Sequence, residues 1–276
     1  MDIISAIPEL RSRLANAGRI AFVPTMGNLH AGHIALAKLA RGRGDCAVAS
    51  IFVNPLQFGQ GEDFAAYPRT LEQDCAKLAE AGCDVVFTPS EAVLYPQPQT
   101  LYVEPPAIAD ELCGAHRPGH FRGVCTVVAK LFNIVQPQVA IFGNKDFQQL
   151  HVLREMARQL DFPIEIVAGE TVRETDGLAM SSRNGYLKPE QRMEAPRLYR
   201  ALQQVVQAIQ SGRHDYAAAQ AQTAQYLTQL GWIVDYIEVR NADTLSKPAP
   251  TDTRLVVLGA ARLGKTRLID NIEFAI

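Results

Sequence analysis

Residues 20–33 read IAFVPTMGNLHAGH, an apolar run that leads into a loop with two glycines and two histidines. The run at 20–24 is short and apolar, which predicts a buried strand. Apolar residues then recur at helical spacing over 33–43, and 46–53 is a continuous apolar run typical of a strand covered on both faces. Strand, helix and strand in this order predict a parallel βαβ unit.

The same alternation continues to about residue 170. The pattern predicts helices at 71–81, 123–135 and 147–159, the first of them ending at Gly82, and strands at 84–87, 139–142 and 164–167. This order indicates an α/β fold, with a parallel sheet and helices on both faces. Ligands of such sheets bind at the carboxyl ends of the strands, so the loops there are where we expect a site.

The sequence changes character at about Thr175. Gln- and Ala-rich helical patterns at 189–210 and 216–230 precede strand-like runs at 232–240, 254–261 and 267–274. We therefore expect two domains, 1–174 and a smaller C-terminal α+β domain at 175–276.

Composition excludes several classes of protein. The 276 residues carry a net charge of −2, which gives no basic excess for a nucleic-acid partner. No apolar run approaches the roughly 18 residues of a membrane span, and the N-terminus does not resemble a secretory signal. The five cysteines are odd in number and lack C-x-x-C spacing, so we expect buried apolar thiols rather than disulfides or a zinc site, in a reducing cytoplasm. His151 and His214 are expected to be ordinary helix residues.

The loop after the first strand is the strongest candidate site. Gly27 and Gly32 let the backbone approach a ligand closely, and the helix that follows offers free N–H groups to an anion. His30 and His33 are three residues apart and share a face at the start of that helix, where they can donate hydrogen bonds to a reacting phosphate. Two solvent-facing histidines, or a pair of metal ligands without a nearby third, are the alternatives.

Two further loops follow predicted strands directly. Asn54 and Gln57 offer neutral amides, which suit the hydroxyl and carboxylate groups of a small polar substrate; an exposed Asn-Pro turn is the alternative. In the second loop, Lys145 is a cation that can neutralise phosphate oxygens, and Asp146 can cap a helix, accept from a ribose or help to hold Mg²⁺. Gln149 lies one turn into the next helix and can face the same crevice.

Two polar segments are more ambiguous. Residues 180–183, Met-Ser-Ser-Arg, can grip phosphates from the domain boundary as a mobile clamp, or can be a plain linker. His116, Arg117, His120 and Arg122 form a basic cluster that can attract anions or support a helix terminus. The acidic stretch 61–64 is expected to be a solvated loop.

The His-x-Gly-His pattern resembles the signature of the nucleotidylyltransferase and class I aminoacyl-tRNA synthetase superfamily. Five stretches in series narrow the resemblance to the pantothenate synthetase (pantoate–β-alanine ligase) family: PTMGNLHAGH, IFVNPLQFG, GHFRGVCTVV, FGNKDFQQL and MSSRN. Their order and spacing, and the length of the chain, also fit this family.

The resemblance implies a Rossmann-like fold and an enzyme of the pantothenate and coenzyme A pathway. It would join (R)-pantoate to β-alanine through a pantoyl adenylate, converting ATP to AMP and pyrophosphate with Mg²⁺, as a homodimer whose C-terminal domain closes over the ATP site. Residues assigned to chemistry are His33, His30, Lys145 and Arg183, and those assigned to pantoate and β-alanine are Gln57, Gln149 and Asn54. The resemblance places in the ATP site Met26, Gly27, Asn28, Leu29, His30, Ala31, Gly32, His33, Gly143, Asn144, Lys145, Asp146, Val172, Met180, Ser181, Ser182 and Arg183.

The chain departs from the family's commonest pattern at Asn144, where Glu is frequent, and at Phe147, where Tyr is frequent. One alternative is a cytidylyltransferase or adenylyltransferase of the same superfamily, although the neutral amides of Gln57 and Gln149 suit a hydroxy acid better than a phosphorylated acceptor. A non-catalytic nucleotide-binding regulator is another, but it would be expected to have lost the histidines, the lysine and the arginine. The sequence identifies no protein ligand for Mg²⁺.

Overall fold

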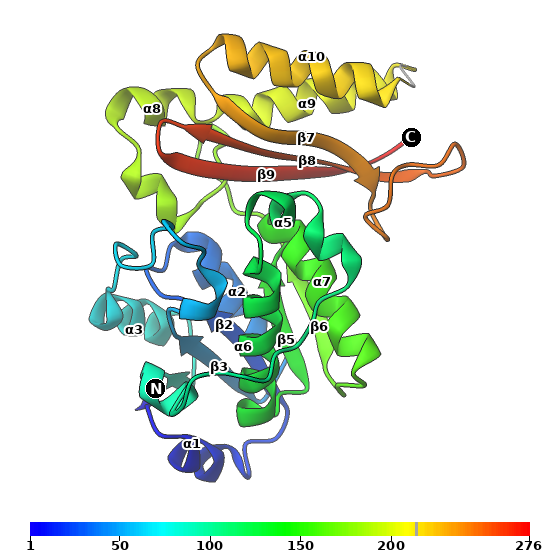
Figure 1. The fold of residues 1–276 in the computed structure, drawn as a ribbon. Coiled ribbons are helices and arrows are strands. Elements are labelled where there is room, and N and C mark those ends of the chain that lie inside the picture. Colours follow the sequence, from blue (N-terminus) through cyan, green and yellow to red (C-terminus); the bar gives the residue numbers. More distant parts are fainter. Residues whose placement is uncertain (213–214) are drawn as a thin grey trace.

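The computed structural model describes residues 1–212 and 215–276, so the expectation for His214 lies outside it. Six parallel strands form the larger sheet, in the order β1-β4-β3-β2-β5-β6 (Figure 1). Their bounds are β1 (Asp2–Ile4), β2 (Ile20–Thr25), β3 (Cys46–Ile51), β4 (Val85–Phe87), β5 (Val139–Gly143) and β6 (Glu165–Gly169). The predicted parallel α/β sheet is confirmed. Strand β1 at its edge was not predicted, because three residues are too few to carry a pattern.

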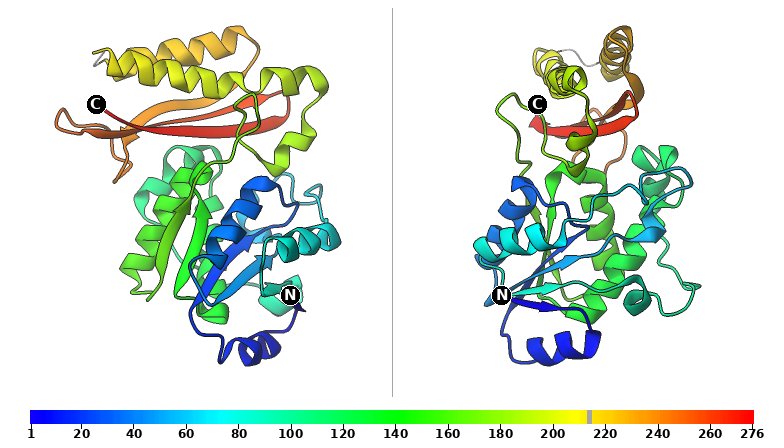
Figure 2. Two further views of the ribbon diagram at one scale, coloured as in Figure 1. Left: turned by 180° about the vertical axis from the view of Figure 1, so that it is seen from behind. Right: turned by 90° about the vertical axis from the view of Figure 1, so that its left-hand side faces the viewer.

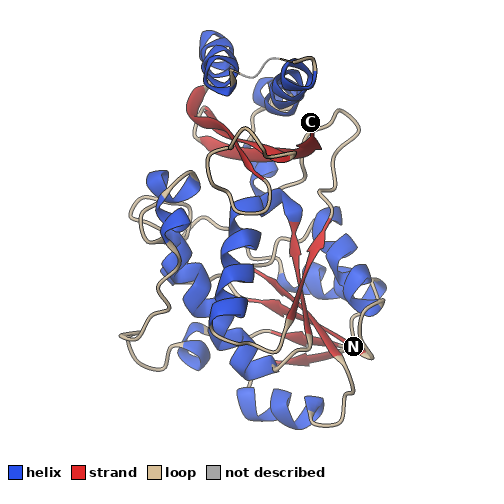
Figure 3. Cartoon of the chain, turned by 90° about the vertical axis from the view of Figure 1, so that its right-hand side faces the viewer, coloured by secondary structure: helices blue, strands red, loops and turns tan. Residues whose placement is uncertain are grey.

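Helices cover both faces of this sheet (Figure 3). They are α1 (Ile7–Leu14), α2 (Ala31–Arg41), α3 (Leu71–Glu80), α4 (Glu91–Leu94), α5 (Cys113–His116), α6 (His120–Val135) and α7 (Phe147–Gln159), with short 3-10 turns η1 (Pro55–Gln57), η2 (Ala107–Asp110) and η3 (Asn144–Asp146). Side chains alternate along a strand, so that Phe22 of β2 packs towards α6 while its neighbours Ala21 and Val23 pack towards α2.

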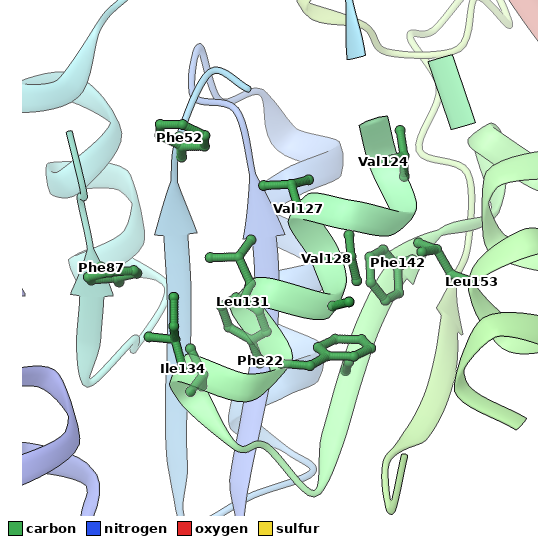
Figure 4. Close-up of a cluster of buried hydrophobic side chains, with 14 of the residues drawn as sticks. Phe22, Phe52, Phe87, Val124, Val127, Val128, Leu131, Ile134, Phe142 and Leu153 are labelled. Atoms are coloured by element: carbon green, nitrogen blue, oxygen red, sulfur yellow. The ribbon is translucent and has the colours of Figure 1, made fainter. Parts of the chain in front are cut away.

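Helix α6 is the most deeply buried, with 12 of its 16 residues buried. Figure 4 shows Val127, Val128 and Leu131 of this helix packed against Phe22 and Phe142 of the sheet. Burial of each such side chain contributes about 1.5–3 kcal/mol. The helix is thereby fixed beside the carboxyl ends of the strands, where it also contacts η1.

The second sheet is antiparallel, in the order β7 (Ile233–Asn241), β8 (Arg254–Leu263) and β9 (Thr266–Ala275). Helices α9 (Arg197–Gln210) and α10 (Tyr216–Gln229) lie on its face turned away from the parallel sheet (Figures 1 and 2). The single helix expected at 189–210 is wrong: it is two helices, α8 (Pro189–Glu194) and α9. Pro196 precedes α9 directly, and a proline in a helix interior would remove a hydrogen bond and clash with the preceding turn.

The expectation that the cysteines are buried thiols is confirmed. All five cysteines are free and buried. None of the helices in the described ranges is long and apolar enough to cross a membrane.

Candidate functional site

A cavity of about 220 Å³ lies at the carboxyl ends of β2, β3, β5 and β6. It brings together most of the residues that the sequence indicated. Those that line it are Met26, His30, Gly32, His33, Asn54, Gln57, Gly143, Lys145, Asp146, Gln149, Val172, Met180, Ser181, Ser182 and Arg183. Gly27, Asn28, Leu29, Ala31 and Asn144, also assigned to the ATP site, are not among its described walls; Leu29 is buried in an apolar cluster with α2 and α3.

His30 and His33 stand at the first turn of α2 with their ring centroids 4.1 Å apart. His30 Nδ1 accepts a hydrogen bond from the Gly32 amide (3.2 Å), and His33 Nδ1 accepts one from the His30 amide (3.3 Å). A ring nitrogen that accepts carries no proton, so each neutral imidazole bears its proton on Nε2. The helix start thus fixes two Nε2–H donors for a ligand.

Both imidazoles are neutral at physiological pH. Burial, followed by the charge of the neighbouring His33 and of Lys145, lowers the pKa of His30 to about 3. Burial and then the charges of Lys145 and Lys77 lower the pKa of His33 to about 4. The pair therefore offers oriented hydrogen bonds rather than positive charge, and Lys145 supplies charge at the same wall.

The loop before these histidines is held by helix α3. Asp74 is fully buried, and its carboxylate accepts from the amides of Asn28 and Leu29, both at 2.8 Å. Lys77 donates to the Leu29 carbonyl at 2.7 Å. These bonds stabilise a backbone that has positive φ at Gly27 (84°) and at Asn28 (51°). Asp74 was missed in the sequence, where an acidic residue in the first turn of a helix is an ordinary dipole-stabilising feature.

Asn54 begins the turn η1 that carries Gln57. Its Nδ2 donates to the Gly123 carbonyl (3.2 Å) and to Gln57 Oε1 (3.1 Å), and its Oδ1 accepts from the Tyr95 hydroxyl (2.8 Å) and the Leu56 amide (3.4 Å). All four hydrogen-bonding positions of this amide are therefore used inside the protein. This geometry favours a role for Asn54 in orienting Gln57 over direct contact with a substrate.

The loop 180–183 is joined to the histidine loop. Ser182 Oγ donates to the Asn28 carbonyl (3.0 Å), and Asn28 Nδ2 donates to the Ser182 carbonyl (3.3 Å). Residues far apart in sequence thus close one side of the cavity. Arg183 Nε and Nη2 both donate to the Asp63 carboxylate, each at 2.9 Å.

Asp63 belongs to the stretch 61–64, so the expectation of a solvated loop there is wrong. Asp63 and Glu62 are half-buried, and Glu62 pairs with Arg117 at 2.6 Å. Two acidic side chains meet two guanidinium groups brought in from distant segments, which no local pattern could indicate. The only signal in the sequence was the position of this stretch directly after the Asn54–Gln57 motif.

The basic cluster is neutralised by acidic partners. Besides the Arg117–Glu62 pair, Arg122 binds Glu104 at 2.6 Å. Burial lowers the pKa of His120 to about 4, and its Nδ1 lies 2.8 Å from the Gln57 carbonyl. The charges of Arg117 and Arg122 are thus paired with carboxylates and are not free to attract anions.

Comparison with known proteins shows the family of the chain. A family model described as pantoate-beta-alanine ligase matches residues 2–273. The pantothenate synthetase of Methylobacillus flagellatus is 62% identical over 276 residues, covering 100% of this chain and 99% of the relative. That of Chromobacterium violaceum is 61% identical over 274 residues, covering 99% of each.

Two solved structures extend the likeness to the fold. The pantothenate synthetase of Thermus thermophilus has a TM-score of 0.93 at 46% identity, covering 99% of each chain. The pantoate–β-alanine ligase of Francisella tularensis, solved with β-γ ATP and β-alanine, has a TM-score of 0.79 at 34% identity, covering 99% of this chain and 97% of that one. Sequence, fold and cavity therefore agree that the chain belongs to the pantoate–β-alanine ligase family, as an enzyme that condenses pantoate with β-alanine using ATP.

Proposed function

We propose that the condensation passes through a pantoyl adenylate held in the cavity between β2, β5 and the loop 180–183. In the first step a pantoate carboxylate oxygen attacks the α-phosphorus of ATP, and the bond to the leaving pyrophosphate breaks. In the second, the amine of β-alanine attacks the acyl carbon, AMP leaves with the bonding oxygen, and the amine loses a proton. The observation that carries this proposal is the pair of fixed Nε2–H donors of His30 and His33 beside Lys145.

The first step needs no general base, because the carboxylate is already a nucleophile. Catalysis then consists of positioning and of stabilising charge on the phosphates. His30 and His33 supply oriented donors, and Lys145 and Arg183 supply cations. Arg183 is paired with Asp63, so a phosphate that binds it must share or replace that carboxylate.

The walls of the cavity fit pantoate as well as ATP. Gln57 and Gln149 offer amides for its hydroxyl and carboxylate groups, while Val124, Val127 and Leu131 of α6 supply an apolar wall for its two methyl groups. Val172 also lines the cavity and is proposed to contact adenine through its backbone.

Magnesium is proposed to enter with the triphosphate. No group of three or more His, Cys, Asp or Glu residues in the described parts of the chain could hold a metal ion by itself. Asp146 is half-exposed at the cavity wall and fits as one oxygen ligand of an ion held mainly by phosphates and water. When bound, the ion would neutralise phosphate charge.

Proposals on the domains, the oligomeric state and the location draw on the resemblance to the pantoate–β-alanine ligase family. We propose that 175–276 form a domain that closes over the ATP site, supported by the reciprocal bonds of Ser182 and Asn28. A homodimer and a cytoplasmic location are also proposed; the dimer rests on the family resemblance, and five free, buried cysteines suit a reducing compartment.

The deciding experiment is pyrophosphate release from Mg-ATP and pantoate, with and without β-alanine. We expect sustained release only with both substrates, together with AMP and pantothenate, and a single slow turnover with pantoate alone. Release that requires a phosphorylated acceptor instead of pantoate would favour a nucleotidylyltransferase. ADP and phosphate as products would rule out the adenylate.

A further inference from the structure

Strand β9 of the antiparallel sheet contacts the turn that carries Lys145. The side chain of Asn271 is buried in this interface, with the residue 5% exposed. Its Nδ2 donates to the carbonyl of Asn144 (3.0 Å) and to the carbonyl of Lys145 (2.9 Å). Both N–H groups of the Asn271 side-chain amide thus donate to consecutive peptide carbonyls of η3, the turn between β5 and α7.

These two bonds fix the backbone from which the lysine side chain projects. A 3-10 turn of three residues has few internal hydrogen bonds, so its geometry depends on outside partners. Two donors from one rigid amide set the orientation of both carbonyls and hence the direction of the Lys145 side chain. Asn144 Nδ2 adds a third bond to β9, at 2.8 Å to Glu273 Oε1.

Asn271 is itself held by its neighbour on β9. The Asp270 carboxylate accepts a hydrogen bond from the backbone N–H of Asn271 (2.8 Å) and binds the guanidinium group of Arg173 through two bonds of 2.7 and 2.9 Å. Arg173 also stacks on Tyr199, with its guanidinium carbon 3.6 Å from the ring centroid. The dipeptide Asp270–Asn271 of β9 is therefore bonded to two segments of the proposed nucleotide site. One is the turn that carries Lys145, and the other is Arg173, which directly follows Val172.

We infer that Asn271 is a positioning residue for Lys145, so that β9 takes part in adenylate formation through the placement of this lysine. The inference rests on the proposed function of Lys145 as the cation that neutralises the phosphates. It gives the C-terminal sheet a task besides closure: it sets where the charge of the lysine lies.

The test is a double-mutant cycle on pyrophosphate release dependent on pantoate. Asn271→Ala should lower kcat by roughly 10- to 100-fold, the scale for misplacing a catalytic group by about 1 Å, with little change in the KM for pantoate. Asn271→Asp has the same size but turns an oxygen towards the two carbonyls, and should lower kcat at least as much. In a Lys145→Ala background neither change should reduce kcat further, because the group that Asn271 positions is gone.

A matched control separates this role from stability. Asn241, at the end of β7, accepts from the amides of Asp243 (2.8 Å) and Thr244 (3.0 Å) in a turn of the same sheet. Asn241→Ala should leave kcat unchanged, although it removes a comparable number of side-chain bonds. If Asn271→Ala does not fold by circular dichroism, Asn271→Asp and Asn271→Ser, which keeps a single donor, take its place in the cycle.

The outcomes are distinct. An equal loss on changing Asn271 in the presence and absence of Lys145 would overturn the inference. A loss from Asn241→Ala as large as that from Asn271→Ala would do the same, since it would reduce the effect to stability. Full activity of Lys145→Ala would instead overturn the proposed function of Lys145, whatever Asn271 does.

Discussion

At the scale of single residues, the chemistry depends on which nitrogen of an imidazole holds the proton. In His30 and His33 the Nδ1 atoms accept from backbone amides, and the low pKa values keep both rings neutral. Glutamine can place an N–H near the position of Nε2, whereas asparagine is too short to do so. Replacing a histidine by glutamine or by asparagine therefore separates the effect of losing the Nε2–H donor from the effect of losing the ring.

His33→Ala should lower kcat by about 10²-fold or more, the scale of losing one donor to developing charge. His33→Gln should lose less than His33→Asn, because it retains a donor near the Nε2 position. Steady-state pyrophosphate release measures all three. Equal activity of the wild type and the alanine variant would mean that His33 has no part in the reaction.

Gln57→Ala should raise the KM for pantoate roughly five- to tenfold, as expected for the loss of a hydrogen bond worth about 1 kcal/mol. The KM for ATP should stay nearly constant, because the Gln57 amide is proposed to bind pantoate and not the phosphates of ATP. Titration calorimetry with each ligand separately checks this. An equal loss of both affinities would indicate a folding defect.

At the scale of elements, Gly123 near the start of α6 lets this helix lie very close to the turn η1, which bears Gln57. A Cβ on Gly123 would lie 2.1 Å from the Leu56 carbonyl oxygen and 2.7 Å from the Gln57 amide nitrogen. Contacts this short with backbone atoms can be relieved only if α6 and η1 move apart. The pantoate end of the cavity therefore depends on a close approach between helix and turn, which hydrophobic periodicity does not reveal.

Gly123→Ala should push η1 away from α6, raise the KM for pantoate roughly tenfold or more, a loss of about 1.4 kcal/mol, and destabilise the fold by about 1–3 kcal/mol. Gly42→Ala is the matched control, because a Cβ there meets its nearest neighbour at an ordinary 3.5 Å. Thermal unfolding and substrate kinetics of the two variants give the comparison. If they behave alike, the close contact at Gly123 does not control the site.

The elements were predictable where a long pattern repeats, and less so elsewhere. The span of α7 matches its expected bounds, and α6 begins three residues earlier than expected, at His120, because its polar first turn lacks the apolar pattern. Fifteen of the expected site residues, on loops, strand ends and first turns of helices, line one cavity, because the strands of one parallel sheet end at one edge. Asp63, Asp74 and Asn271 were missed because their partners are distant in sequence.

At the scale of the whole molecule, buried neutral histidines link stability to pH. Burial lowers the pKa of His30 to about 3 and those of His33 and His120 to about 4, from an ordinary value of 6.5. Below that ordinary value the unfolded chain takes up protons that the folded chain refuses. The stabilisation is thus complete above pH 6.5 and is lost as the pH falls towards about 4.

The free energy of unfolding should therefore decrease between pH 7 and pH 5, a window above the ordinary pKa range of carboxylates. Urea titrations at pH 7, 6 and 5 measure the slope. His120→Asn should reduce it, because one of the histidines whose pKa is lowered by burial no longer titrates. A free energy that stays constant over this range would show that these histidines take up protons at the same pH in the folded and the unfolded chain.

The burial of all five cysteines has a practical consequence. Thiolates are the reactive species, and burial raises the pKa of Cys83 to about 11 and that of Cys125 to about 12. Maleimide dyes should therefore not label the cysteines of the native chain. Cysteines introduced at exposed Glu80 of α3 and at exposed Lys247 between β7 and β8 would carry a donor and an acceptor fluorophore, so energy transfer between them would follow the two sheets during turnover.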